Sequence, residues 1–213
     1  MKKAFKEGLI DGAVGALEVR YSPIIDDVEP KKLVVLSHPH PLHGGTMNNK
    51  VVTTMERTFQ SLGYATVAYN FRGVGQSEGE YSHGEGEQAD LLAVIKWAKQ
   101  RFKTEHLTLA GFSFGSYVAL KVAHSKQIEV NALCTVAPPV GLYDFSGLLS
   151  KEGGEEIFWT LIQGGQDEVV SAKEILNWAM SQPNKPDVYW RQQAGHFFHG
   201  ELIWLKKVIL LAF

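Results

Sequence analysis

The sequence predicts an α/β protein in which helices cover both faces of a mostly parallel sheet. Three observations lead to this fold class. Strand and helix patterns alternate from residue 33 to the end of the 213-residue chain. The predicted strand Leu33 to Leu36 is continuously apolar, as expected of a strand buried on both faces of a parallel sheet. The pentapeptide Gly111-Phe112-Ser113-Phe114-Gly115 has the form G-x-S-x-G and lies between a predicted strand and a predicted helix.

The first half of the chain predicts an antiparallel edge followed by alternating strands and helices. A strand pair with a glycine-rich turn from Gly8 to Gly15 is expected first, because Leu17, Val19 and Tyr21 alternate with polar residues. The helices that follow are indicated by apolar residues at spacings of three and four. The expected elements are a strand pair at about 4–22, strands at 33–36 and 64–70, and helices at 49–62 and 85–102.

The second half continues the alternation, with the G-x-S-x-G turn at its start. The helix after Ser113 is apolar nearly all round, which is typical of a helix buried against a sheet. The expected strands are at 107–110, 130–137, 156–163 and 188–192, and the expected helices are at 116–123, 172–180 and 200–212. Together these elements predict a three-layer αβα sandwich around a sheet of about eight strands, formed as one domain over residues 1–213.

Composition and charge exclude several classes of protein. At 45% hydrophobic residues the chain can bury one full core, and a net charge of -2 gives no reason to expect a nucleic-acid or anionic-membrane partner. No apolar run has the length of a membrane span, so we expect a soluble, cytoplasmic protein. Cys134 is the sole cysteine and lies in an apolar run, which favours a core residue over a nucleophile.

The candidate chemistry centres on Ser113. A serine hydroxyl is a weak nucleophile until a base takes its proton, and the base needs an acid to orient it. His196 is the best candidate base, because it follows the last predicted strand and would lie at the same sheet edge as Ser113. His199 is its nearest competitor, at the start of the last helix.

The candidate acid is Asp167, which comes directly after a glycine turn at the end of the preceding strand. Its neighbour Glu168 is expected to be solvated and to serve the N-terminus of the next helix. The chain order Ser113, Asp167, His196 is the order of the α/β-hydrolase architecture.

Sequence stretches from His38 to Gly200 resemble the serine-dependent α/β-hydrolases, and specifically the small capless carboxylesterases related to dienelactone hydrolases. The stretches are HPHPLHGGTMNNK, NFRGVGQSEG, GEGEQAD, GFSFGS, GGQDEVV and GHFFHG. Two positions depart from that branch: Ser113 stands where dienelactone hydrolases have cysteine, and Asn70 stands where an aspartate is common. The resemblance implies an α/β-hydrolase fold without a cap domain and a small-molecule ester as substrate.

Such enzymes hold the oxyanion with two backbone N–H groups. The first is expected from Phe114, directly after the serine. The second is expected from the loop 38–45, where Pro39 and Pro41 have no N–H, so that His40, Leu42 or a later residue must supply it. The sequence leaves this choice open, with His40 and Leu42 as the named candidates.

The same loop supports a rival interpretation as a metal site. His38, His40 and His43 have the spacing of the H-x-H-x-D-H motif of metallo-β-lactamase-like hydrolases. The aspartate of that motif is replaced by Leu42, and no complete ligand set can be assembled downstream. We therefore expect neither a metal nor a cofactor.

The expected function is hydrolysis of carboxylic esters with short acyl chains. Only about twenty residues separate the strands at 130–137 and 156–163, too few for a substantial cap, so the site should be an open cleft with Tyr143 and Phe197 among its substrate-binding walls. Thioester or small-peptide and amide hydrolysis is the alternative, since the same triad serves all three. A hydrolase-fold binding module without activity is the alternative from another class. The sequence does not indicate the oligomeric state.

Overall fold

The computed structural model describes residues 5–22, 30–146 and 157–213, which contain eight strands and five α-helices. The strands are β1 (Lys6–Asp11), β2 (Ala16–Tyr21), β3 (Lys32–Ser37), β4 (Ala65–Tyr69), β5 (His106–Phe112), β6 (Ala132–Val136), β7 (Phe158–Gly164) and β8 (Asp187–Arg191). The helices are α1 (Lys50–Ser61), α2 (Glu85–Arg101), α3 (Phe114–His124), α4 (Ala172–Ser181) and α5 (Leu202–Ala212). A short 3-10 turn, η1 (Pro41–His43), follows β3.

All eight strands form one sheet in the order β1-β2-β4-β3-β5-β6-β7-β8. β1 and β2 pair antiparallel, and so do β2 and β4, whereas every neighbouring pair from β4 to β8 is parallel. The predicted α/β-hydrolase fold with an antiparallel N-terminal edge is therefore confirmed. The first turn is shorter than predicted, because Gly8 pairs with Val19 inside β1 and the turn spans only Gly12 to Gly15.

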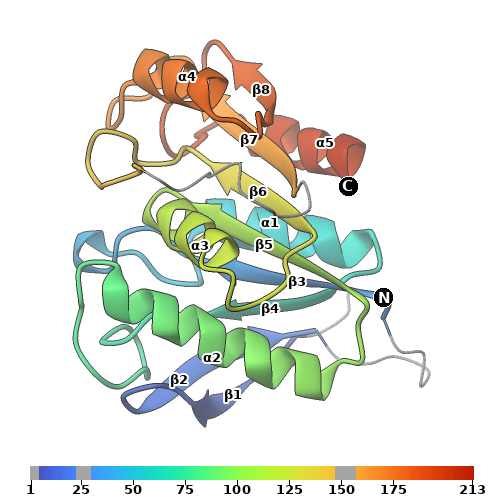
Figure 1. The fold of residues 1–213 in the computed structure, drawn as a ribbon. Coiled ribbons are helices and arrows are strands. Elements are labelled where there is room, and N and C mark those ends of the chain that lie inside the picture. The colour runs from blue at the N-terminus through green and yellow to red at the C-terminus, as the bar shows by residue number, and fades with distance from the viewer. Residues whose placement is uncertain (1–4, 23–29, 147–156) are drawn as a thin grey trace.

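Helices cover both faces of the sheet, as Figure 1 shows. Residues of α2, α3 and α4 belong to one hydrophobic cluster, and residues of α1 and α5 belong to the other. In β3, Leu33 and Val35 enter the first cluster while Val34 and Leu36 enter the second. This alternation explains why the strand has no polar side, and it supports the interpretation of its apolar run.

Cys134 is fully buried in β6, within the cluster formed by α1 and α5. Burial raises the pKa of its thiol to about 12, because the thiolate would be desolvated there. The side chain therefore behaves as a packed core residue, as the sequence indicates.

The parallel strands end at a common edge, and this edge carries the loops that hold the candidate site. The loops follow Ser37 of β3, Phe112 of β5, Gly164 of β7 and Arg191 of β8. The connection from β6 to β7 also starts at this edge, and its residues 147–156 are outside the described part of the chain. In the ranges that are described, no cap domain is present and no helix is long and apolar enough to cross a membrane.

Candidate active site

Ser113 occupies a strained turn between β5 and α3. Its backbone has φ 52° and ψ -120°, in the left-handed region that residues other than glycine seldom adopt. A Cβ at Gly111 would overlap the Gly115 carbonyl, and a Cβ at Gly115 would overlap the carbonyl of Ser37 in β3. Both glycines of the pentapeptide are therefore required by close backbone approach, not only by flexibility.

Hydrogen bonds from both sides hold this strained turn. The Ser113 N–H donates to the Val136 carbonyl at 2.8 Å. The hydroxyl of Ser116, one turn into α3, donates to the Gly111 carbonyl at 2.7 Å and accepts from the Val136 N–H at 3.2 Å. The strain is thus imposed by β6 and α3, as expected where a backbone outlier is built into a site.

His196 lies directly over Ser113, in the loop between β8 and α5. Its Nε2 is 3.0 Å from the Ser113 hydroxyl oxygen, and its Nδ1 is 2.9 Å from Asp167 Oδ2. The imidazole is almost completely buried, packed against Phe112 and Phe197 with ring centroids 5.1 Å away in both cases. The three predicted residues therefore form one continuous hydrogen-bonded chain.

Asp167 is held by donors on both carboxylate oxygens. The backbone N–H groups of Val169 and Val170 donate to Oδ1 at 3.0 and 2.9 Å, and the Gln163 amide donates to Oδ2 at 2.9 Å. Burial would raise the pKa of this carboxyl, but the bonds from His196 and from the two N–H groups outweigh it and hold the pKa below its ordinary value. Asp167 is therefore ionised at neutral pH and accepts the Nδ1–H of His196.

Glu168 is exposed to solvent, as predicted, but it does not serve the next helix. Its Oε2 accepts a hydrogen bond from the His196 backbone N–H at 3.0 Å, while α4 is capped by the Ser171 side chain. The second part of the prediction is wrong, because the loops after β7 and β8 lie close enough for Glu168 to span them. Adjacent acids thus bind the same histidine, one at its ring and the other at its main chain.

We expect Glu168→Ala to lower kcat by about five- to twenty-fold with little change in KM, because the main chain of His196 loses its acceptor. Glu168→Gln should stay within about three-fold of the wild-type kcat, since its amide oxygen can accept the same N–H. Steady-state kinetics on a chromogenic ester measure both variants. Equal loss in the two variants would instead indicate that the negative charge matters, and no loss in either would remove Glu168 from the site.

The competing histidine lies outside this chain of bonds. His199 is exposed, and its ring stacks on Phe197 at 5.8 Å. Phe197 itself is 38% exposed while it contacts the His196 ring, so it presents an apolar wall beside the imidazole. Its role as a substrate wall stays a prediction.

The loop after β3 distinguishes between the two candidate oxyanion donors. The Leu42 N–H donates to His40 Nδ1 at 3.1 Å within η1, and the Leu42 side chain is 69% exposed. Leu42 is therefore engaged elsewhere, and the His40 N–H, next to Pro39, remains as the candidate. The Phe114 N–H lies at the first position of α3, where a helix has N–H groups without partners in the helix.

His38 anchors this loop from beneath. Its Nδ1–H donates to the Pro39 carbonyl at 2.6 Å, and its Nε2 accepts from the Phe71 N–H at 3.0 Å. Both ring nitrogens are thus used by backbone groups, which leaves none for a metal. In the described ranges, no three His, Cys, Asp or Glu side chains gather as a metal ion would need.

Because His38 is buried, the free energy of unfolding should depend on pH. Burial lowers the pKa of its imidazole to about 4, from 6.5 in a solvated histidine. The unfolded chain then binds the proton more readily, so His38 stabilises the fold fully above pH 6.5 and loses on the order of 3 kcal/mol as the pH falls to about 4. Urea unfolding at pH 7 and pH 5 measures the effect, and His38→Gln should show a smaller fall. An equal fall in wild type and variant would contradict it.

Tyr143 lies in the loop after β6 and packs on the helix that follows Ser113. Its ring stacks on Tyr117 at 4.8 Å and lies 5.4 Å from the ring of Phe114. The ring is half-buried and its hydroxyl reaches Tyr81. Tyr143 thus lies close to the residue that follows Ser113, and its role as a substrate wall stays a prediction.

Residues 20–157 match the family model described as X-Pro dipeptidyl-peptidase (S15 family). The chain belongs to this family. Membership places it among the α/β serine hydrolases, which confirms the resemblance seen in the sequence. The match covers Ser113 and the loops around it but ends before Asp167 and His196, so the geometry of the latter two rests on the structure alone.

Similarity to solved α/β serine hydrolases and to a curated relative extends over nearly the whole chain. A lidless α/β serine hydrolase from Xanthomonas campestris is 36% identical with a TM-score of 0.89, and covers 100% of this chain and 94% of its own. An α/β serine hydrolase homologue from Coxiella burnetii is 41% identical with a TM-score of 0.88, over 97% of this chain and 96% of its own. An uncharacterized protein of Rickettsia prowazekii is 34% identical over 93% of this chain and 84% of its own.

Two further side chains at the site were not singled out from the sequence: Gln163 donates to Asp167, and Tyr81 joins His40 to Tyr143. His38 was considered only as a metal ligand, whereas in the structure it accepts from the Phe71 N–H and holds the loop after β3. Gln163 did carry a signal, since it is a polar residue at the end of the apolar run of β7. Tyr81 carried none, because its partners are 41 and 62 residues away in the sequence.

Proposed function

We propose that this S15-family hydrolase cleaves carboxylic esters through an acyl-enzyme. The observation that carries the proposal is the unbroken chain of hydrogen bonds from Ser113 through His196 to Asp167, with Ser113 held at a strained turn. A serine in such a chain gains a general base within reach of its proton. The fold alone would not justify the proposal, since hydrolase folds host many functions.

In the first half of the reaction, the Ser113 oxygen attacks the ester carbonyl while His196 Nε2 takes the hydroxyl proton. The carbonyl oxygen becomes an oxyanion, which the N–H groups of Phe114 and His40 stabilise. Collapse of this intermediate breaks the bond to the alcohol, and His196 returns the proton to the leaving oxygen. Asp167 holds the imidazole in the tautomer with Nδ1–H and stabilises the imidazolium between these two steps.

In the second half, a water molecule replaces the alcohol. His196 takes a proton from the water as its oxygen attacks the acyl carbon, and the same two N–H groups hold the second oxyanion. The bond to Ser113 then breaks, His196 returns the proton to the serine oxygen, and the carboxylic acid is released. No redox change occurs, one ester and one water molecule are consumed per cycle, and Ser113 and His196 are regenerated.

Small-peptide or amide hydrolysis is the second candidate, and the family match favours it specifically. The family description names X-Pro dipeptidyl peptidases, and the same serine chemistry cleaves amides. A panel of p-nitrophenyl butyrate, its thioester analogue and an X-Pro p-nitroanilide discriminates between these functions. We expect the oxygen ester to give the highest kcat/KM, whereas a preference for the X-Pro anilide would make the protein a peptidase.

Among esters, we expect kcat/KM to be highest for short acyl chains and to fall beyond about six to eight carbons. The described residues form no cap over Ser113, and Tyr143 beside it is only half-buried. A longer chain would lie partly in water and forgo part of the roughly 0.8 kcal/mol that full burial of each methylene contributes. A p-nitrophenyl ester series from acetate to palmitate measures the profile.

Interfacial activation provides the control for this prediction. Without an apolar roof, the rate should not rise when the substrate exceeds its micellar concentration. An optimum at long chains, or a jump in rate at that concentration, would show that residues 138–155 form a roof. Residues 147–155 of that stretch are outside the described ranges.

A further inference from the structure

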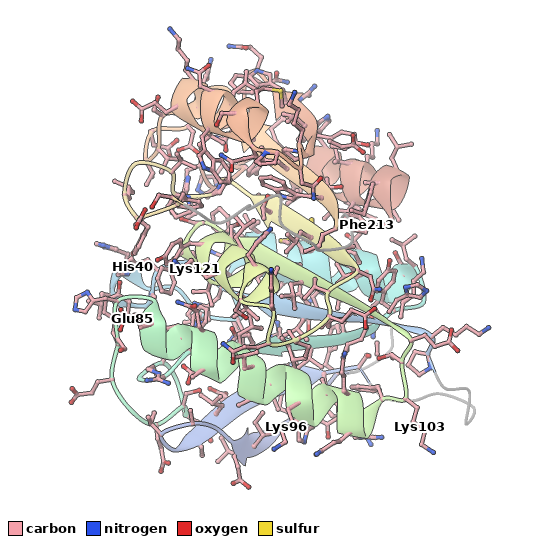
Figure 2. All side chains as sticks on the ribbon, viewed as in Figure 1. His40, Glu85, Lys96, Lys103, Lys121 and Phe213 are labelled. Atoms are coloured by element: carbon pink, nitrogen blue, oxygen red, sulfur yellow. The ribbon has the colours of Figure 1, made fainter. Side chains whose placement is uncertain are left out.

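Tyr143 stands at the end of a chain of hydrogen bonds that begins in the oxyanion loop. The Leu42 N–H donates to His40 Nδ1 at 3.1 Å, His40 Nε2 lies 3.2 Å from the Tyr81 hydroxyl, and that hydroxyl lies 3.3 Å from the Tyr143 hydroxyl. Figure 2 labels His40 near Glu85, the first residue of α2. Tyr81 lies in the loop just before this helix. The side chains thus connect three loops at the carboxyl edge of the sheet.

The first of these bonds determines the tautomer of His40. Because Nδ1 accepts from the Leu42 N–H, it carries no proton, and the neutral ring must carry its proton on Nε2. Burial and the neighbouring His43 and His83 lower the pKa of His40, so the ring is neutral at neutral pH. His40 Nε2–H therefore donates to the Tyr81 oxygen.

A count of protons shows that one donor in this series of hydrogen bonds has no acceptor within the series. His40, Tyr81 and Tyr143 bring three protons to two contacts, and each contact uses one. Mutual polarisation favours the order in which Tyr81 accepts from His40 and donates to Tyr143, since accepting a bond makes a hydroxyl a better donor. The proton of Tyr143 is then the one left over. In the described ranges, Tyr81 is the only hydrogen-bond partner of the Tyr143 hydroxyl.

The Tyr143 ring is held firmly enough for this donor to be directional. It is stacked on Tyr117 with an interplanar angle of 28° and also contacts Phe114 and His40. Burial raises the pKa of its phenol well above the ordinary range, so the hydroxyl keeps its proton at every pH at which the enzyme would work. A substrate oxygen beside Tyr143 would give this donor an acceptor.

The position of Tyr143 places this donor on the acyl side of the substrate. His196 must deliver a proton to the leaving alcohol, so the alcohol lies next to the His196 ring. That ring packs against Phe112 and Phe197, whereas Tyr143 packs against Phe114 and Tyr117 in the helix that follows Ser113. The acyl group points away from His196, and the helix side offers it the Tyr143 hydroxyl.

We propose that Tyr143 is a specificity-determining residue whose hydroxyl donates a hydrogen bond to an oxygen in the acyl chain. The preferred substrates are then esters of short oxygen-bearing acids, such as alkoxy, hydroxy or oxo acids. The inference deepens the proposed function and rests on it.

The test compares p-nitrophenyl methoxyacetate with p-nitrophenyl butyrate, two esters of nearly equal size in which one oxygen replaces one methylene. For each variant, the kcat/KM for methoxyacetate is divided by the kcat/KM for butyrate. Comparing this ratio between variants cancels the difference in intrinsic reactivity of the two esters. We expect Tyr143→Phe to lower the methoxyacetate-to-butyrate ratio about three- to ten-fold, the range for one neutral hydrogen bond. Tyr81→Phe, which keeps the terminal hydroxyl, should lower it less. Thermal unfolding checks that both variants keep the fold.

In Tyr143→Phe, the neighbouring Tyr81 hydroxyl could donate to the substrate instead. The double variant Tyr81→Phe with Tyr143→Phe removes this donor as well, so its methoxyacetate-to-butyrate ratio should fall at least as far as that of Tyr143→Phe. A ratio within two-fold of wild type in both Tyr143→Phe and the double variant would overturn the inference. If wild-type turnover is at the same time abolished by Ser113→Ala, the inference alone fails. Failure of the wild type to hydrolyse either ester would overturn both the inference and the proposed function.

Discussion

Ser113→Ala is expected to abolish ester turnover, with a loss in kcat of at least about 10⁴-fold, because the nucleophile is removed and water cannot replace it in this mechanism. Thermal stability should stay close to that of the wild type. The Ser113 hydroxyl bonds only to His196 in the described ranges, and the strained turn is held by bonds that do not involve the hydroxyl. Ester kinetics and a thermal unfolding curve on the same preparation measure the two quantities.

Ser116→Ala is the matched control for Ser113→Ala. Ser116 is buried and its hydroxyl bonds to Gly111 and Val136, so its loss should lower the melting temperature by several degrees. Because these bonds also hold the turn at Ser113, kcat should fall, but by far less than in Ser113→Ala, where the nucleophile itself is removed. Opposite effects in the two variants would separate chemistry from packing. Turnover that persists in Ser113→Ala would show that another group is the nucleophile.

Asp167→Asn is expected to lower kcat by about 10⁴-fold. The carboxylate accepts four different donors, and an amide has only one acceptor oxygen to replace two. An amide group turned towards His196 would favour the tautomer with its proton on Nε2, which cannot take the proton of Ser113. Ester kinetics at neutral pH measure the loss, where the wild-type carboxyl is ionised.

Glu168→Gln removes one negative charge at the adjacent position and is the control for Asp167→Asn. Its amide oxygen can still accept the His196 N–H, so its turnover should be close to that of the wild type. A large loss in Glu168→Gln with near-normal turnover in Asp167→Asn would mean that the acid of the triad has been misassigned.

The fold could be predicted almost completely from the sequence, because its signals are local. The continuous apolar run of β3 and the helical spacing of apolar residues in α2 both follow from burial, and burial is imposed on each segment by its own side chains. Boundaries were less precise. Gly8 was expected in a turn but lies within β1, since pairing with Val19 outweighs its low strand propensity.

Only those residues of the candidate site that directly follow a strand could be predicted from the sequence. Ser113, Asp167 and His196 each follow a strand of a parallel sheet, so the topology brings them to one edge. The partner of Glu168 and the hydroxyl contact between Tyr81 and Tyr143 depend on how separate loops approach one another, for which the sequence contains no local signal. The choice between His40 and Leu42 required the η1 turn, whose hydrogen bond occupies the Leu42 N–H.

The most direct test of the central claim is covalent labelling of the native protein with a fluorophosphonate, followed by peptide mass mapping. A fluorophosphonate reacts with a serine only when a base activates the serine, so it reports on the nucleophile without requiring the natural substrate. We predict one label per chain, on the peptide that contains Ser113, greatly slowed by Asp167→Asn and absent in Ser113→Ala. An unlabelled wild-type protein, or a label on a different residue, would contradict the account.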